Sequence, residues 1–358
     1  MDKNRIEKGP HNKTISNLLT FMVSLLFTFL MAEIILFNFT DLRKDEMKVW
    51  IDEKKGRGSG MCYTSNKNGY FPLILKHPIT GRRLYCIIYD IDKRKAGYFT
   101  ERKKQAAIVG DSFVFGEGVK GEDTLGYLLG MKFTGINFRN FGVIGADIRL
   151  VRGTIEHIIK EEKQIKDIIY FYNLNDVIMS DKLTSHQKYI FDFQNIRWFN
   201  VEKHHWFITN ILSKSTIFCL IKKAFILRRE TKLTIKNYLD MYFDASNQKE
   251  LKRTIDLLVS MNKIAEDNDV RFHVVIYPLL YKDNFGRYPF VSIHNFLKDI
   301  CKEHSISCID AYPAFRKYRS FKKFIVHPID YHPNGSANKI VVDWLAEEGE
   351  INFRPSRD

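Results

Sequence analysis

A short apolar run, Ala106 to Val109, meets a Gly-Asp-Ser turn that holds the residue best suited to covalent chemistry. The run is typical of a strand that is covered on both faces of a sheet. If a helix follows Gly110, Ser112 lies at its first turn, where free backbone N–H groups and the positive end of the helix dipole favour a developing negative charge. A hydroxyl there can act as a nucleophile, although a tight turn capped by Asp111 or Ser112 explains the tripeptide equally well.

Two further polar turns follow expected strands. Gly145 comes after the strand 136–141, and a glycine at a strand-to-helix turn can offer its N–H to an anion or simply make a tight turn. Asn175 comes after the strand 166–172, where its NH₂ group could face a reacting carbonyl. The alternative is that Asn175 or Asp176 caps the next helix.

A base is available near the end of the chain. Asp330 and His332 lie two residues apart, so in extended backbone their side chains point the same way. An Asp beside a His can set its tautomer and support the imidazolium that forms when it accepts a proton. His327 is the rival base, and an ordinary loop is the alternative for the whole segment.

The elements that must position these residues alternate between strand and helix. This order predicts one parallel sheet with helices on both faces and a ligand site at the carboxyl ends of the strands. The expected strands after Ser112 are 136–141, 166–172, 272–277 and 306–309, and the expected helices are 147–160, 251–265, 293–303 and 336–345.

Residues 41–104 form a β-rich lead-in. Strands are expected at 71–75 and 84–89 around a turn at 78–81. Cys62 and Cys86 could bridge there or remain free thiols.

An insertion at about 180–246 interrupts the alternation and carries a basic amphipathic helix at 217–229. That helix could lie on an anionic membrane surface or pack on the main domain with its charges in solvent. The insertion also holds Trp198, His204, His205 and Trp206. The two adjacent histidines project to different sides, so we do not expect them to share a metal ion.

The segment Leu18 to Phe37 is long enough to cross a bilayer and carries one charge, Glu33. A cleavable signal peptide is the alternative, but the apolar stretch is long for one and no small-x-small cleavage site follows. We therefore expect an uncleaved anchor. Glu33 can snorkel to the interface or pair with another helix.

The positive-inside rule does not orient this anchor, because basic residues flank both ends. They are Lys3, Arg5, Lys8 and Lys13 before it, and Arg43, Lys44, Lys48, Lys54 and Lys55 after it.

The whole chain of 358 residues has a formal net charge of +14. We find no zinc-finger spacing, no aromatic RNA-binding motif and no concentrated basic helix early in the chain, so nucleic acid is not an expected partner. An anionic membrane or acidic glycan explains the charge as well. Five cysteines make no metal-ligand pattern and leave the redox compartment open; they are Cys62, Cys86, Cys219, Cys301 and Cys308.

Taken in order, Ser112, Gly145, Asn175, Asp330 and His332 resemble the four blocks of the SGNH or GDSL-type hydrolase superfamily. The resemblance covers about 105 to 345. Asn173 stands where the third block usually has glycine, and the last block is Asp-x-His in place of the commoner Asp-x-x-His. Its Asp-x-His-Pro-Asn form is similar to that of membrane-anchored bacterial members that act on acylated glycans outside the cytoplasm.

The resemblance implies a three-layer α/β/α fold with a five-stranded, mostly parallel, flavodoxin-like sheet behind one transmembrane helix. The expected organisation is a cytoplasmic tail and anchor at 1–40, the lead-in at 41–104 and a hydrolase-like domain at 105–352, outside the cytoplasm. The oligomeric state is left open.

The implied activity is a serine esterase that removes or transfers O-acyl groups, such as acetyl, on a glycan. Ser112 would be the nucleophile, His332 the base and Asp330 the acid, while Ser112, Gly145 and Asn175 would form the oxyanion hole. No metal or organic cofactor is required. The alternatives are an O-acyltransferase or a lipid esterase with the same site, and a non-catalytic glycan-binding or assembly protein.

Overall fold

The computed structural model describes residues 10–39, 48–51, 59–66, 71–76, 83–181, 183, 215–282, 286–328 and 330–348. Trp198, His204, His205 and Trp206 of the expected insertion lie outside these ranges. The chain divides into two compact units, Met1–Asp45 with Phe193–Arg229 and Glu46–Asp192 with Glu230–Asp358. The second unit contains all the residues of the expected site.

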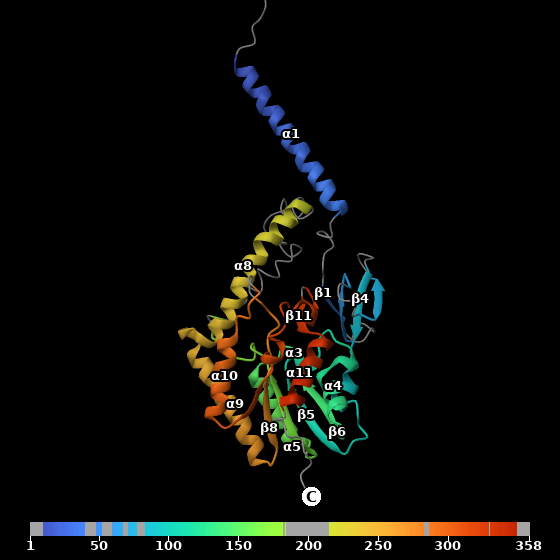
Figure 1. Cartoon of the computed structure of the whole chain (residues 1–358), viewed down its shortest axis with the longest axis vertical. Helices are drawn as coiled ribbons and strands as arrows, with labels where there is room; N and C mark the ends of the chain where they lie inside the picture. Colours follow the sequence, from blue (N-terminus) through green and yellow to red (C-terminus); the bar gives the residue numbers. More distant parts are fainter. Residues whose placement is uncertain are drawn as a thin grey trace, which may run out of the picture. The chain divides into compact units, whose positions relative to one another are not determined.

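A five-stranded parallel sheet is the centre of the second unit (Figure 1). Its order is β6-β5-β7-β8-β9, and every neighbouring pair is parallel. The apolar runs expected as strands at 106–109, 136–141, 166–172, 272–277 and 306–309 all lie in it, because strands covered on both faces are apolar along much of their length. Their bounds are β5 Lys104–Gly110, β6 Ile136–Gly142, β7 Ile165–Tyr172, β8 Arg271–Ile276 and β9 Ser307–Asp310.

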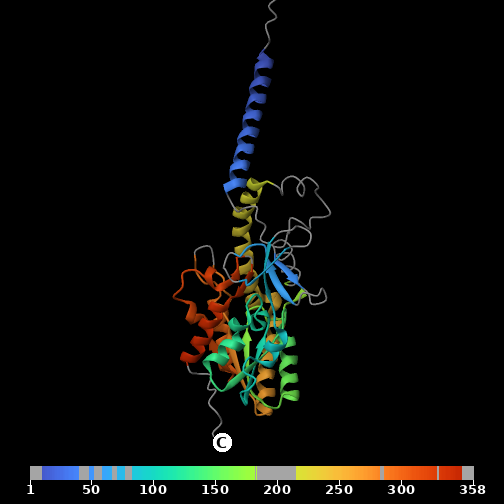
Figure 2. The same ribbon diagram turned by 90° about the vertical axis from the view of Figure 1, so that its right-hand side faces the viewer.

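Helices cover both faces of this sheet, so the expected three layers are confirmed (Figure 2). On one side α5 (Ile148–Glu161) packs against α9 (Gln248–Asp267), and on the other α4 (Leu125–Lys132) packs against α11 (Gly335–Glu348). A further helix, α10 (Val291–Glu303), contacts β9. The apolar side chains of α9 that face inward are buried, namely Leu251, Leu258, Met261 and Ala265.

The strand order reverses direction at β5. From β5 the chain moves outward to β6 and then crosses back to β7 on the other side of β5. The loops that follow these strands therefore separate above β5, which is where ligands bind in sheets of this kind. The first of these loops leads directly into α3, Ser112–Phe115.

A smaller antiparallel sheet precedes β5. It has the order β1-β2-β4-β3 and consists of β1 Lys48–Ile51, β2 Gly60–Tyr63, β3 Leu73–Lys76 and β4 Arg83–Ile88. Cys62 lies directly opposite Cys86 and forms a disulfide with it. The structure thereby settles the pairing that the sequence left open.

The described part of this unit also contains several short elements. They are α2 Ile91–Ala96, the antiparallel pair β10 Ile325–His327 and β11 Asp330–Pro333, and the 3₁₀ turns Gly121–Asp123, Ala245–Asn247, Tyr312–Phe315 and Lys322–Phe324.

Among its described residues, the first unit contains one helix that is long and apolar enough to cross a membrane. This is α1 (Pro10–Phe39), whose segment Thr14–Leu36 has a mean hydropathy of 2.2, a test that a signal sequence would also pass. Glu33 of α1 accepts hydrogen bonds from Ser215 Oγ at 2.9 Å and from the backbone N–H of Ile217 at 3.1 Å. Glu33 therefore caps the N-terminus of α8 (Thr216–Phe243), which is the pairing with another helix that the sequence suggested.

Candidate active site

Ser112 opens α3, as its sequence position predicts. The side chain of Asp111 accepts a hydrogen bond from Phe113 N at 2.9 Å and so caps the helix. The helix ends after one turn at Gly116, which has a φ of 81°, a left-handed conformation that glycine adopts without strain. Ser112 is therefore held at a helix N-terminus immediately beyond the carboxyl end of β5.

His332 reaches Ser112 from the far end of the chain. Its Nε2 lies 2.8 Å from Ser112 Oγ, and its Nδ1 is hydrogen-bonded to Asp330 Oδ1. The ring of Phe113 packs edge-on against the imidazole at 5.5 Å. Figure 1 shows α3 and β11 close together at one end of the sheet. Three of the residues predicted from the sequence thus form one hydrogen-bonded chain.

Tyr63 extends this chain beyond Asp330, and the sequence did not indicate it. Its hydroxyl donates a hydrogen bond to Asp330 Oδ2 from β2 of the small sheet. Burial and the neighbouring Asp330 carboxylate raise the pKa of Tyr63 well above its usual range, so the hydroxyl stays protonated and remains a donor. Asp330 therefore has a hydrogen-bond partner on each of its two oxygens.

His327, the rival base, lies at the end of β10 and faces a different set of residues. It is buried, stacks on Tyr63 with 4.6 Å between the ring centres, and has its Nε2 3.2 Å from Ser65 Oγ. Of the two histidines considered, His332 is the one that contacts Ser112.

The turn after β7, which contains Asn173 and Asn175, is connected to the Ser112 turn through Asp111. Its buried carboxylate accepts a hydrogen bond from Asn173 Nδ2 at 3.0 Å, and the Asn175 amide acts to lower its pKa. Burial raises the pKa of Asp111, while the bonds from Phe113 N and these two amides act in the opposite direction. Asn173 thus cross-links the Ser112 turn and the turn that follows β7.

Gly145 lies in a turn that is tied to both of its neighbours. Val143 N donates to Gly110 O at 3.0 Å, and Ile148 N donates to Asp176 O at 3.0 Å. Gly145 itself has a φ of 75°, a backbone conformation that other residues rarely adopt. The glycine turn is therefore fastened between the end of β5 and the block that contains Asn175.

A second carboxylate also faces His332. Glu117 Oε2 lies 3.5 Å from His332 Nε2, and the Glu117 side chain is only 6% exposed. By distance alone, Glu117, Asp330 and His332 could share a metal ion. However, the two ring nitrogens of His332 already face Asp330 and Ser112, so the cluster fits proton transfer better than metal binding.

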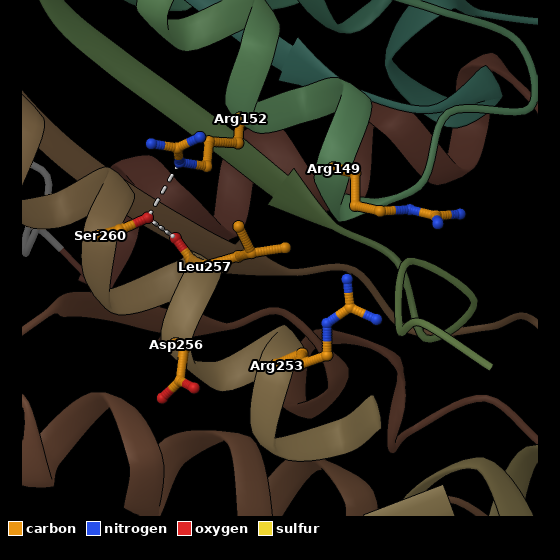
Figure 3. Close-up of a pocket in the computed structure, with 6 residues that line it drawn as sticks. All are labelled: Arg149, Arg152, Arg253, Asp256, Leu257 and Ser260. Carbon is orange, nitrogen blue, oxygen red and sulfur yellow. Dashed lines mark hydrogen bonds between the residues drawn. The ribbon is translucent and has the colours of Figure 1, made fainter. Parts of the chain in front are cut away.

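An open cleft between α5 and α9 holds three arginines but none of the site residues (Figure 3). It has a volume of about 510 Å³. Each guanidinium already faces a carboxylate: Arg149 pairs with Asp147, Arg152 with Glu156 and Arg253 with Glu250. The positive charge of the cleft is therefore largely offset.

Comparisons with known proteins give matches to solved structures only; no family model and no curated protein matches the chain. A lipolytic protein of the G-D-S-L family from Veillonella parvula is 13% identical, with a TM-score of 0.41, and the match covers 70% of this chain and 98% of that one. Another from Desulfitobacterium hafniense is also 13% identical, with a TM-score of 0.40 and coverage of 68% and 98%.

An acetylxylan esterase from Geobacillus stearothermophilus is 14% identical, with a TM-score of 0.38 and coverage of 74% and 99%. Identities this low say nothing about a substrate, so any activity must be argued from the site itself. The chain is similar to solved members of the GDSL group, the group that its sequence motifs resemble.

Proposed function

We propose that the chain is a serine esterase, an acyl-ester hydrolase in which Ser112, His332 and Asp330 carry the reaction. The observation that carries the proposal is the hydrogen-bonded chain from Ser112 Oγ through the His332 imidazole to Asp330, with 2.8 Å between Oγ and Nε2. A serine hydroxyl is activated when a base accepts its proton and a third group orients that base.

In the first half-reaction, Ser112 Oγ attacks the ester carbonyl carbon while His332 Nε2 accepts the hydroxyl proton. Asp330 on Nδ1 stabilises the imidazolium that results. His332 then returns the proton to the departing alcohol oxygen as the bond from that oxygen to the acyl carbon breaks. The acyl group is left on Ser112.

The negative charge that develops on the carbonyl oxygen needs donors that are already in place. Backbone N–H groups of Ser112 and Gly145 and the amide of Asn175 would supply them. The turn that carries Asn175 is joined to Asp111 by Asn173 Nδ2 at 3.0 Å, which supports this role because a donor held rigidly does not have to reorganise during the reaction. In the second half-reaction water attacks the acyl carbon while His332 accepts a proton from it; the bond from that carbon to Ser112 Oγ then breaks, and His332 returns the proton to Oγ.

We propose an extracytoplasmic O-acylated glycan as the substrate class. The Cys62–Cys86 disulfide supports the compartment, since disulfides persist in oxidising surroundings, and α1 would hold the chain at the membrane. Because a sugar hydroxyl can replace water in the second half-reaction, acyl transfer between glycans is the same chemistry with a different acceptor.

One observation favours a lipid esterase as a second candidate. Val143 and Ile144 beside Gly145 are each 40% exposed, and Tyr331 beside His332 is 44% exposed. These side chains offer apolar surface next to the site, which would suit an acyl chain longer than acetyl.

The test is labelling of the full-length chain in detergent with a fluorophosphonate, which reacts with activated serines. We expect labelling of the wild type and its loss in Ser112→Ala and His332→Ala. Ser336→Ala, which changes a serine outside the site, is the control and should label normally. A folded wild type that resists the reagent would refute the proposed function.

Ester hydrolysis by unlabelled wild-type protein then separates the two substrate classes. We expect acetylated oligosaccharides to be deacetylated faster than p-nitrophenyl esters are hydrolysed, whatever the length of the ester's acyl chain. A rate that rises with chain length would instead favour the lipid esterase.

A further inference from the structure

Glu117 is a buried carboxylate that lies near His332 Nε2, the nitrogen that accepts the proton of Ser112 in the proposed mechanism. Its side chain is 6% exposed, and Oε2 lies 3.5 Å from Nε2. Burying a carboxylate is costly unless its charge is compensated. We propose that Glu117 is a second carboxylate of the proton-transfer site, which stabilises protonated His332 from the Nε2 side as Asp330 does from the Nδ1 side. This inference rests on the proposed function.

The backbone around Glu117 is fastened at several points. Glu117 N and Gly116 N each donate to Ser112 O at 3.0 Å. Arg94, itself buried, donates to Phe115 O at 2.7 Å and to Val119 O at 2.6 Å, so it spans the loop from both sides of Glu117.

Tyr89 also holds this loop, through a hydrogen bond to its backbone. Its hydroxyl accepts a hydrogen bond from Gly118 N at 2.7 Å. The position of Glu117 is therefore set by the same one-turn helix that sets Ser112, together with a buried arginine and tyrosine. A loop held in this way can keep a carboxylate near the base at a constant distance.

The charges that face His332 are mainly negative. Asp330 contacts it from its own strand, Glu117 from the loop after α3, and Asp111 from the α3 cap, where His332 acts on the Asp111 charge. The Phe113 ring edge adds an apolar contact, and Tyr63 lies behind Asp330 as a neutral donor. Negative neighbours favour the protonated imidazole, so both carboxylates should make His332 a stronger base.

This arrangement has a consequence for catalysis. When the proton of Ser112 moves to Nε2, the positive charge forms on a ring whose Nε2 lies 3.5 Å from Glu117 Oε2. Glu117 acts through His332 and is therefore a positioning residue for the proton. Its removal should leave a site that works with a weaker base.

The experiment compares Glu117→Gln with Glu122→Gln, an identical change of charge at an exposed glutamate five positions along the chain. The pKa of His332 is measured in full-length protein in nanodiscs by NMR with ¹³C-labelled histidine, and its signal is assigned with His332→Gln. We expect Glu117→Gln to lower the His332 pKa by about one unit or more, and Glu122→Gln to leave it unchanged. An equal His332 pKa in the two variants overturns the proposal.

The same variants are followed by the pH dependence of fluorophosphonate labelling. The acidic limb of the labelling rate should move to lower pH in Glu117→Gln by the amount seen in the titration, and Glu117→Asp, which keeps the charge, should stay nearer to wild type. A purely structural role would reduce the rate without moving the limb. If wild type does not label at all, the proposed function fails, while the His332 titration still decides the role of Glu117.

Discussion

At the scale of single residues, the Ser112 site depends on polar side chains that hold one another. Asp111 binds Asn173, Asp330 binds Tyr63, and each of these contacts is buried. A buried polar group that loses its partner costs more than the bond itself contributes. Substituting one of these residues should therefore reduce activity even where its side chain never touches the substrate.

Asn175→Ala tests the proposed oxyanion hole. Loss of one donor costs about 3 kcal/mol of transition-state stabilisation in comparable sites, so we expect kcat to fall by about 100-fold. The melting temperature should change little. Asn295→Ala, on the exposed face of α10, is the control and should keep full activity. Wild-type turnover in Asn175→Ala would remove Asn175 from the site.

Tyr63→Phe tests the donor behind Asp330. The change keeps the ring and removes only the hydroxyl, which leaves Asp330 Oδ2 without this donor. A hydrogen bond to a charged group contributes about 1.5–3 kcal/mol, so kcat should fall about tenfold or more while the protein still folds.

The matched control for this variant is Tyr85→Phe. Tyr85 lies opposite Tyr63 in the neighbouring strand, and the same change there should leave kcat unaltered. Equal effects of the two substitutions would mean that the small sheet is merely destabilised.

At the scale of the elements, one ion pair joins the edge strand to the end of a helix. Arg139 of β6 donates two hydrogen bonds to Glu162, which caps the C-terminus of α5, at 2.6 and 2.8 Å. These bonds lower the pKa of Glu162 against the opposing effect of its burial. The pair is partly exposed, so its stabilising contribution is about 0.5 kcal/mol.

The stability conferred by this pair should depend on pH. Because the folded-state pKa of Glu162 is lowered, the contribution is present above the ordinary carboxyl pKa of about 4.3 and is lost as the pH falls through the folded value. Urea unfolding of Glu162→Gln and wild type should differ at pH 7 and converge near pH 3. Glu161→Gln, at an exposed neighbour, is the control: the difference between its free energy of unfolding and that of wild type should not change between pH 7 and pH 3.

At the scale of the whole molecule, the chain combines an apolar helix with a unit that carries a disulfide. The segment Thr14–Leu36 can cross a bilayer, and Cys62 and Cys86 are paired and fully buried. A buried disulfide is expected where the surroundings are oxidising. The proposal that the α/β unit lies outside the cytoplasm rests on these two features and predicts a definite orientation.

Protease protection tests this orientation. In sealed right-side-out vesicles, added protease should digest the α/β unit and spare a tag at the N-terminus, while inside-out vesicles should give the reverse. Cys62 and Cys86 should be recovered as a disulfide-linked peptide. Digestion of the α/β unit only in inside-out vesicles would place it in the cytoplasm.

Much of the framework was predictable because its signals are local. The strands of the sheet appear as short apolar runs, and α5 and α9 appear as helical spacing of apolar residues, since burial on one face imposes that pattern directly. Ser112, Asp330 and His332 were recognisable because a serine at a strand-to-helix turn and an Asp two residues before a His have a chemical meaning within a few residues.

The tertiary structure alone decided which of these groups meet and what else joins them. Tyr63 lies 267 residues from Asp330, and a tyrosine in a β-rich segment carries no local sign of its partner. The sequence likewise left Cys62 and Cys86 open and offered His327 as well as His332. Glu117 is close to Ser112 in the chain, but its direction depends on the left-handed Gly116 and on Arg94. Contacts between distant segments follow from how the sheets pack, which no local pattern records.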